Sequence, residues 1–513
     1  MRVLIGLTFL LLLTSVTAAE SERQGAVSLE EIGRRLLDDG MRSGQAMALL
    51  TELCEQAPHR QAGSGGGRTA ETLGRRWMER FGFQEVRQES FEVRHWERGP
   101  VERAAMEIPS GETASLTVCA LGGSVGTRSG GITAPVLEVG DLEEVATRAD
   151  EVKGRIVFFN RPMDPTKVMT FQAYGGAADQ RVHGPSVAAK YGAVGVVVRS
   201  MTLKADDVPH TGIMIYEDDA PKIPAAALGF RSADRLAEAL KQHPGLSLTL
   251  ELSAKELPPV EARNTLGQIT GSERPEEVVV LGCHLDAWDK GCGAHDDGAG
   301  CAQAVEALRL LGRLGLPLRR TVRVVLYMDE EMGGVGGKAY AGAEARKAEP
   351  HVYAIESDRG GFVPLGFSVD AEDPVVEGLR RRTLPMLKLL GLHDLERGGG
   401  GVDIGPLVEI GCTTIGLIPD SQRYFDVHHS DNDVLEAVHP RELELGAIAM
   451  AALAYALANE SRLTRIFGPA LSPRPLPVYC SQADNQPWEV VHGPATCPTH
   501  PGDLSHRRSD GRM

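Results

Sequence analysis

Apolar runs alternate with amphipathic stretches over the second half of the chain. Four short apolar runs, at residues 278–281, 322–327, 352–355 and 413–418, predict strands. Residues 298–314 and 441–459 have the spacing of helices, and Pro440 precedes the second of them as a first-turn residue. Near-continuous apolar strands that alternate with helices are typical of a mostly parallel sheet covered by helices on both faces. The sequence therefore predicts an α/β fold.

Three other segments differ from this pattern. Residues 28–82 have helical spacing, interrupted by a glycine-rich turn, whereas residues 115–252 contain short apolar runs that predict a β-rich insert. The last 51 residues hold eight of the 30 prolines and no sustained apolar period, which predicts a flexible tail. We therefore divide the chain after its first 19 residues into four parts: 20–114, the insert 115–252, 253–462 and the tail 463–513.

The first residues have the pattern of an export signal. Arg2 precedes an apolar stretch at residues 3–13, and small residues follow it up to Ala19. A basic start, an apolar segment of about 7–15 residues and small residues at its end are typical of a secretory signal peptide. We predict a signal peptide over residues 1–19 and export to the periplasm or the medium. No later run reaches the roughly 18 apolar residues of a membrane span, so none is expected in the mature chain.

Composition and charge exclude several classes of protein. The 54 Lys and Arg residues against 70 Asp and Glu residues give a net charge of −16, which argues against a nonspecific nucleic-acid binder. With 42% hydrophobic residues, the chain has the composition of a folded protein. Eight cysteines permit disulfides in an exported chain, and Cys480 with Cys497 is the pair we expect first. Cys283, Cys292 and Cys301 are interpreted as core or loop residues, with a thiolate metal site as the alternative.

Acidic residues and histidines follow the predicted strands. Along the chain these groups are His284-Leu285-Asp286, Asp296 in the next loop, Asp329-Glu330-Glu331, Glu356-Ser357-Asp358, and His428-His429. Because functional groups of such sheets gather outside the carboxyl ends of the strands, we expect these side chains to lie close together. Carboxylates gathered at one edge repel one another unless cations neutralise them. Imidazole nitrogens with carboxylate oxygens suit Zn²⁺, and one aspartate can bridge two ions.

The order of these motifs resembles the co-catalytic di-zinc exopeptidases, which include bacterial aminopeptidases and glutamate carboxypeptidase. Within them the carboxypeptidase Q group is the most similar. The matching segments are HLDAWD at 284–289, DDG at 296–298, EEMGGVG at 330–336, ESD at 356–358, HHS at 428–430 and HWERG at 95–99. The resemblance runs from about residue 40 to about residue 460 and excludes the predicted signal and tail.

The resemblance implies a complete ligand set and two supporting acids. The implied roles are His284 and Asp358 as ligands of one Zn²⁺, Glu331 and His429 as ligands of the other, Asp296 as their bridge, Glu330 as general base, and Asp286 as the residue that orients His284. The resemblance also implies a protease-associated-like insert and a homodimer. Because a metal can anchor a free substrate amine, the expected activity is exopeptidase action on short peptides or dipeptides.

Other classes of function share some of these features. A glutaminyl cyclase-like acyltransferase uses a similar ligand set with one zinc, and a receptor-like binding ectodomain keeps the fold but loses ligands. Residues 122–126 fit the G-x-S-x-G pattern of serine hydrolases, without the strand-to-helix context of that motif. A second di-zinc peptidase family inserts a dimerisation domain before its last histidine, and the 71 residues from Asp358 to His429 are too few for it. We therefore predict a secreted di-zinc metallo-exopeptidase.

Overall fold

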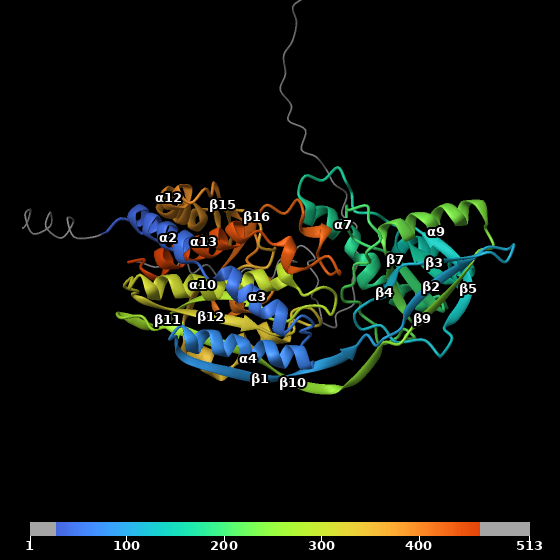
Figure 1. Ribbon diagram of the computed structural model, residues 1–513, viewed down its shortest axis with the longest axis horizontal. Coiled ribbons are helices and arrows are strands. Elements are labelled where there is room, and N and C mark those ends of the chain that lie inside the picture. The colour runs from blue at the N-terminus through green and yellow to red at the C-terminus, as the bar shows by residue number, and fades with distance from the viewer. Residues whose placement is uncertain (1–26, 462–513) are drawn as a thin grey trace, which may run out of the picture. The chain divides into compact units, whose positions relative to one another are not determined.

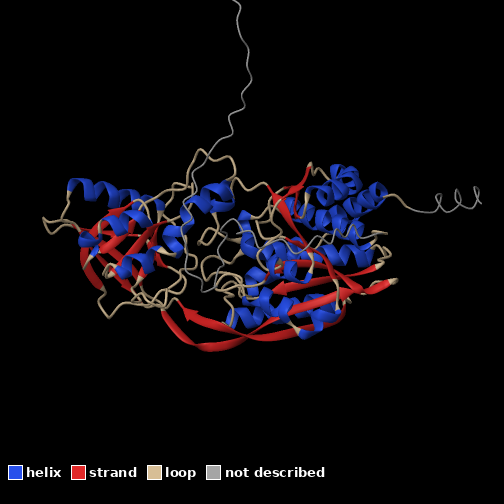
Figure 2. Ribbon diagram, turned by 180° about the vertical axis from the view of Figure 1, so that it is seen from behind, coloured by secondary structure: helices blue, strands red, loops and turns tan. Residues whose placement is uncertain are grey.

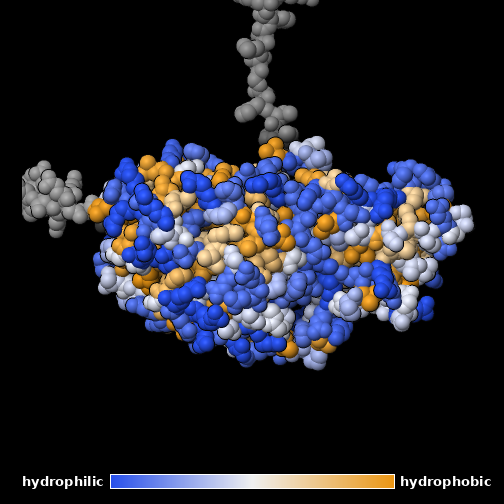
Figure 3. All heavy atoms as spheres, viewed as in Figure 1, coloured by the Kyte–Doolittle hydropathy of each residue, from blue (hydrophilic) through white to orange (hydrophobic). Residues whose placement is uncertain are grey.

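The computed structural model describes residues 27–461, which contain two eight-stranded sheets (Figure 1). The predicted signal peptide, the predicted tail and the Cys480–Cys497 pair lie outside the described residues. From residue 27 to residue 461, no helix combines the length and the apolar character that crossing a membrane requires. On the face seen in Figure 3, hydrophilic residues cover most of the area and apolar residues lie in small groups between them.

The first sheet has the strand order β1-β10-β12-β11-β13-β16-β14-β15. Its strands are β1 (Gln84–Glu97), β10 (Lys255–Ile269), β11 (Arg274–His284), β12 (Arg320–Tyr327), β13 (His351–Glu356), β14 (Pro364–Asp370), β15 (Asp394–Arg397) and β16 (Thr413–Pro419). The four central strands β12, β11, β13 and β16 run parallel, whereas β1, β10 and β14 join the sheet antiparallel. The predicted α/β class is confirmed, and the predicted strands are the parallel centre of the sheet.

Side chains of the first sheet alternate between two hydrophobic cores. Along β11, Val279 and Leu281 lie in one core, and Val278 and Val280 lie in the other. The larger core is covered by α2 (Leu29–Ser43), α3 (Ala46–Gln56), α4 (Gly65–Arg80), α10 (Ala299–Arg313), α12 (Asp373–Leu389) and α13 (Pro440–Ala458). The opposite core is covered by α11 (Val335–Gly342) and a 3₁₀ helix (Gly405–Ile410). Helices therefore lie on both faces, as predicted.

The second sheet contains the insert and has the order β3-β2-β9-β5-β6-β7-β8-β4. Its strands are β2 (Glu102–Glu107), β3 (Thr113–Leu116), β4 (Val118–Ala120), β5 (Ile132–Val139), β6 (Ile156–Phe159), β7 (Gly195–Arg199), β8 (Ala225–Leu228) and β9 (Ser247–Leu252). Its helices are α5 (Leu142–Thr147), α6 (Ala149–Val152), α7 (Thr170–Val182), α8 (Gly184–Lys190) and α9 (Phe230–Gln242). Besides the short strands predicted for this region, the insert thus contains helices, two of which, α7 and α9, span 13 residues each. The sheet includes β2, which precedes the boundary expected at residue 115.

Two long strands join the sheets to each other. β1 leads into β2, and β9 leads into β10, so β1 and β10 carry the chain into and out of the second sheet (Figure 2). They pair antiparallel from Gln84 opposite Gln268 to Glu97 opposite Lys255. Main-chain hydrogen bonds between these strands therefore hold the insert to the first sheet.

A buried carboxylate joins three helices over the larger core. Glu444 of α13 is 7% exposed, and its Oε2 accepts a hydrogen bond from the Ala46 amide at the start of α3, at 3.2 Å. The side chain also contacts Glu306 of α10, which pairs with Arg309 at 2.6 Å. Burial, together with the charge of Glu306, raises the pKa of Glu444 to about 8.

We expect the protein to lose stability between pH 6.5 and pH 9, with on the order of 2 kcal/mol coming from Glu444. The folded-state pKa of about 8 lies above the ordinary value of 4.5, so the stability is present at low pH and is lost as the pH rises through 8. In Glu444→Gln this contribution is absent, and the melting temperature should fall less over the same interval. Scanning calorimetry at both pH values tests this, with Glu442→Gln on the same helix as the control. Equal decreases in wild type and Glu444→Gln would contradict the prediction.

Candidate metal centre

The acids and histidines predicted from the strand ends converge at the carboxyl edge of the four parallel strands. His284 ends β11, and Glu331 follows β12 after a three-residue turn. Asp358 comes two residues after β13, and His429 lies in the segment that connects β16 to α13. All four are buried or nearly so, Asp358 being the most exposed with 20% of its side chain accessible. The first sheet therefore brings together residues that lie up to 145 positions apart in the sequence.

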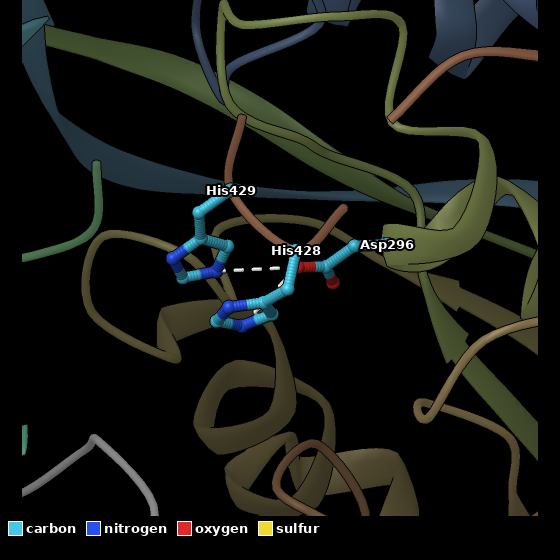
Figure 4. A group of neighbouring side chains, drawn as sticks. All are labelled: Asp296, His428 and His429. Carbon is cyan, nitrogen blue, oxygen red and sulfur yellow. Dashed lines mark ion pairs between the residues drawn. The ribbon is translucent and has the colours of Figure 1, made fainter. Parts of the chain in front are cut away.

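Asp296 stands at the middle of this group. Its Oδ1 lies 3.2 Å from Nε2 of His284, and its Oδ2 lies 3.2 Å from Nε2 of His429. Figure 4 shows the carboxylate facing the imidazoles of the His428–His429 pair. The two oxygens of one carboxylate thus face two different histidines.

A second carboxylate accompanies each histidine. Asp358 Oδ1 lies 3.3 Å from Nε2 of His284, and Glu331 Oε2 lies 3.0 Å from Nε2 of His429. The ring of His428 stacks on that of His429 with 3.5 Å between centroids, and its Nε2 is 3.6 Å from Asp296 Oδ2. His429 therefore contacts two of the predicted ligands, Asp296 and Glu331. His428 contacts Asp296 at a longer distance than His429 does.

Buried carboxylates hold the main chain around Asp296. Asp433 accepts hydrogen bonds from the amides of His295 and Asp296, at 2.7 and 3.1 Å. Asp297 accepts from the amides of His284 and Gly300, at 3.2 and 3.0 Å. The loop that carries Asp296 is therefore tied both to β11 and to the segment that carries His429.

Asp286 lies beneath the neighbouring glutamates. Its Oδ1 accepts from the Glu330 amide at 3.2 Å, and its Oδ2 accepts from the Glu331 amide at 3.3 Å. The Nδ1 atom of His284 lies 3.0 Å from the main-chain carbonyl oxygen of Asp286, whereas the Asp286 carboxylate is 3.9 Å away. In the structure, Asp286 thus contacts His284 mainly through its backbone and uses its side chain to hold the turn after β12.

The electrostatics of the site favour a cation. Burial alone would lower the pKa of His284, but the charge of Asp358 and the hydrogen bond to Asp296 outweigh it and raise that pKa well above its usual value. Burial would raise the pKa of Asp296, yet hydrogen bonds to His284 and His429 hold it well below its usual value. Protons shared between buried imidazoles and carboxylates mark a place where positive charge is stabilised.

Comparisons with known proteins identify the family. The model of peptidase family M28 matches residues 264–455. Carboxypeptidase Q of Mus musculus is 34% identical over 382 residues, which cover 74% of this chain and 79% of that protein. The chain belongs to peptidase family M28. Carboxypeptidase Q of Xenopus laevis is 32% identical over 435 residues, covering 84% of this chain and 90% of that protein. Membership in family M28 confirms the predicted metallopeptidase and its resemblance to the carboxypeptidase Q group.

Solved structures have the same fold as this M28 peptidase. A peptidase M28 precursor from Shewanella amazonensis superposes with a TM-score of 0.82 at 30% identity, covering 86% of this chain and 99% of that chain. A zinc aminopeptidase from Bacillus subtilis has a TM-score of 0.60 at 19% identity, covering 82% of this chain and 96% of that one. At 19% identity, the likeness to the Bacillus subtilis protein shows a shared fold alone.

Two alternative interpretations of the sequence lose support in this M28 peptidase. Ser124 is buried, its hydroxyl donates to the Val125 carbonyl at 2.9 Å and accepts from the Ala225 amide at 2.8 Å, so it is no exposed nucleophile. Cys283 and Cys301 lie in the larger hydrophobic core, as expected for core residues. Within the described residues, the groups arranged to hold a metal consist of histidines and aspartates.

Sequence reasoning missed the residues of the insert that contact the site. Thr211 donates its amide to the His429 carbonyl at 2.9 Å, and Nδ1 of His210 lies 2.6 Å from the carbonyl oxygen of His428. No motif marks these positions, because their partners are main-chain carbonyl groups that lie 218 residues later in the sequence. In this M28 peptidase the insert therefore lines the metal centre.

Proposed function

We propose that the protein is a secreted di-zinc exopeptidase that hydrolyses short peptides or dipeptides. The carboxylate of Asp296 carries the proposal, because its two oxygens each lie 3.2 Å from a different histidine. A carboxylate that faces two separate donor groups supports a bridge between two ions. Membership in family M28 supports hydrolysis of peptide bonds.

The donor atoms of the site fit Zn²⁺. Imidazole nitrogens and carboxylate oxygens are ligands that Zn²⁺ takes in hydrolytic enzymes. Glu331 Oε1 is buried without a hydrogen-bond partner among the described residues, which is costly for a carboxylate unless a cation neutralises it. The proposed ligands are His284 and Asp358 for one ion, Glu331 and His429 for the other, and Asp296 for both.

Glu330 is the proposed general base. Zinc bound at this site would lower the pKa of a water molecule and polarise the scissile carbonyl. Glu330 would accept the proton of that water and later donate it to the nitrogen of the leaving amine. Burial raises the pKa of Glu330 well above its usual value, and the nearby charge of Asp358 acts in the same direction. Asp286 supports this role by holding the Glu330 amide in place.

The remaining parts of the proposal rest on the sequence and on relatives. Export is proposed from the signal-like residues 1–19. Exopeptidase action on short peptides is supported by relatives whose name is Carboxypeptidase Q. The homodimer implied by the family resemblance stays a prediction, which sedimentation of the purified protein would test.

We expect the purified protein to contain about two zinc ions per chain and to lose dipeptide hydrolysis when a chelator removes them. The reason is that the Asp296 carboxylate lies between His284 and His429, so each histidine can hold one ion while Asp296 binds both. Elemental analysis gives the metal content, and dipeptide turnover is measured before chelation, after it, and after zinc is restored. Full peptidase activity with one metal or none would contradict the proposal. One zinc with turnover of N-terminal glutaminyl peptides would favour the acyltransferase, and fewer than two zinc ions without any turnover would favour the binding ectodomain.

A further inference from the structure

The two histidines proposed as zinc ligands are supported from different domains. Nδ1 of His284 lies 3.0 Å from the carbonyl oxygen of Asp286, in the same domain and two residues away. Nδ1 of His429 lies 3.4 Å from the carbonyl oxygen of Thr211, in the insert. A carbonyl oxygen only accepts, so each Nδ1 must carry the proton, which leaves the lone pair of Nε2 for a metal. The carbonyl oxygen that faces Nδ1 thus belongs to the first domain for His284 and to the insert for His429.

Main-chain hydrogen bonds fix the insert segment 210–212 against the His428–His429 segment. The Thr211 amide donates to the His429 carbonyl at 2.9 Å, and the His210 ring donates through Nδ1 to the His428 carbonyl at 2.6 Å. The segment is itself held by Thr211 Oγ1, which donates to the Ala120 carbonyl at 2.8 Å. His429 has a φ of 59°, a backbone conformation that non-glycine residues adopt only when their surroundings hold them there.

Gly212 allows this close approach. A Cβ atom on Gly212 would lie 2.8 Å from Nδ1 of His429 and closer still to the guanidinium of Arg181. The residue has a φ of 135°, which side chains rarely permit. A glycine at this position is therefore required for the insert to reach the ring of His429.

A second loop of the insert supports the same ring from another side. The Gly122 amide donates to the Gly212 carbonyl at 2.9 Å, which ties the two loops together. A Cβ on Gly122 would fall on the indole of Trp288, at 1.9 Å from the nearest ring atom. That indole meets the imidazole of His429 edge to face, with 5.7 Å between ring centroids. The backbone of Gly122 therefore packs against Trp288, and Trp288 packs against His429.

We propose that the insert positions a ligand of the metal centre. Its segment 210–212 sets the orientation and the tautomer of His429. Thr211 and Gly212 are thus positioning residues that act through His429. Hydrogen-bond partners of metal-bound histidines typically contribute 10–100-fold to metal affinity. Since His284 has its partner in its own domain, a disturbance of the insert should weaken the metal at His429 and Glu331 and spare the metal at His284 and Asp358. This inference rests on the proposed di-zinc function.

The test is the zinc affinity of Gly212→Ala. We expect one zinc per chain, the one held by His429 and Glu331, to dissociate about 10–100-fold more readily than in wild type, while the other zinc is held as before. Competition titration with a chromogenic chelator resolves the two affinities, and the absorption spectrum of the Co²⁺-substituted protein reports the geometry of each site. The retained first zinc also shows that the variant is folded.

Three further variants make the result specific. Gly176→Ala in α7 of the insert is the matched control, because a Cβ there meets nothing within 4 Å, and we expect two unchanged affinities. Gly122→Ala should weaken the same zinc as Gly212→Ala by displacing Trp288, and it replaces Gly212→Ala if that variant does not fold. Arg181→Ala checks the other contact of the added Cβ. Arg181 Nη1 also donates to the Thr211 carbonyl at 3.3 Å, so we expect this variant to weaken the zinc at His429 and Glu331 as well. If it weakens the zinc at His284 and Asp358 instead, the role given to Thr211 and Gly212 is wrong.

Two outcomes are clearly separable. If Gly212→Ala and Gly122→Ala both keep two wild-type zinc affinities, or lose both ions equally while folded, the insert does not position His429 and the inference is overturned. If the wild-type protein itself binds fewer than two zinc ions, the proposed function fails before any variant is compared.

Discussion

Glu330→Gln should lower turnover by about 10²–10⁴-fold while both zinc ions and peptide binding are retained. Glutamine keeps the size and polarity of the side chain but cannot accept the proton of the attacking water. The Glu330 amide would still donate to Asp286, so the turn after β12 should not move. Dipeptide kinetics and zinc titration on the same preparation test both halves of this expectation.

Glu331→Gln is the matched variant, because the two glutamates share one turn and one supporting carboxylate. Glu331 Oε2 lies 3.0 Å from Nε2 of His429, whereas the charges acting on Glu330 include His284 and Asp358. We therefore expect Glu331→Gln to weaken one zinc and to regain part of its activity in excess zinc. A Glu330→Gln protein that loses zinc and works again when zinc is restored would reverse the two roles.

The parallel centre of the fold was readable from the sequence because burial on both faces leaves a strong signal. All side chains of β12 and β13 are buried, and each strand contains an uninterrupted apolar run, residues 324–327 in β12 and 352–355 in β13. Since the carboxyl ends of parallel strands meet at one edge, the residues after each predicted strand could be expected in one place. His284, Asp296 and Glu331 could therefore be predicted from the sequence alone to lie close together.

The antiparallel edges of the sheet left no such signal. β1 has the sequence QEVRQESFEVRHWE, and only Val93 and Trp96 of its side chains are buried, because one side of this edge strand faces solvent or the neighbouring elements. β1 is stabilised by its pairing with β10, which lies about 170 residues later in the sequence. Local periodicity does not reveal a pairing over such a distance. The same limit applies to Thr211, whose backbone contacts with His429 depend on how the insert packs.

Asp296→Asn should have the broadest effect on metal binding of any single ligand change, because Asp296 faces both histidines. The amide keeps one oxygen, replaces the other by a nitrogen without a free lone pair, and removes the negative charge between the sites. We expect both zinc affinities to fall and turnover to drop by about 10³-fold or more, since stabilisation by a metal is worth several kcal/mol and each 1.36 kcal/mol is a factor of ten. Asp358→Asn is the control, because its contact within the ligand set is to His284, so it should weaken one zinc and leave the other. If Asp296→Asn weakens one zinc only, the two sites do not share the carboxylate, and the proposed di-zinc bridge would have to be replaced by two independent sites.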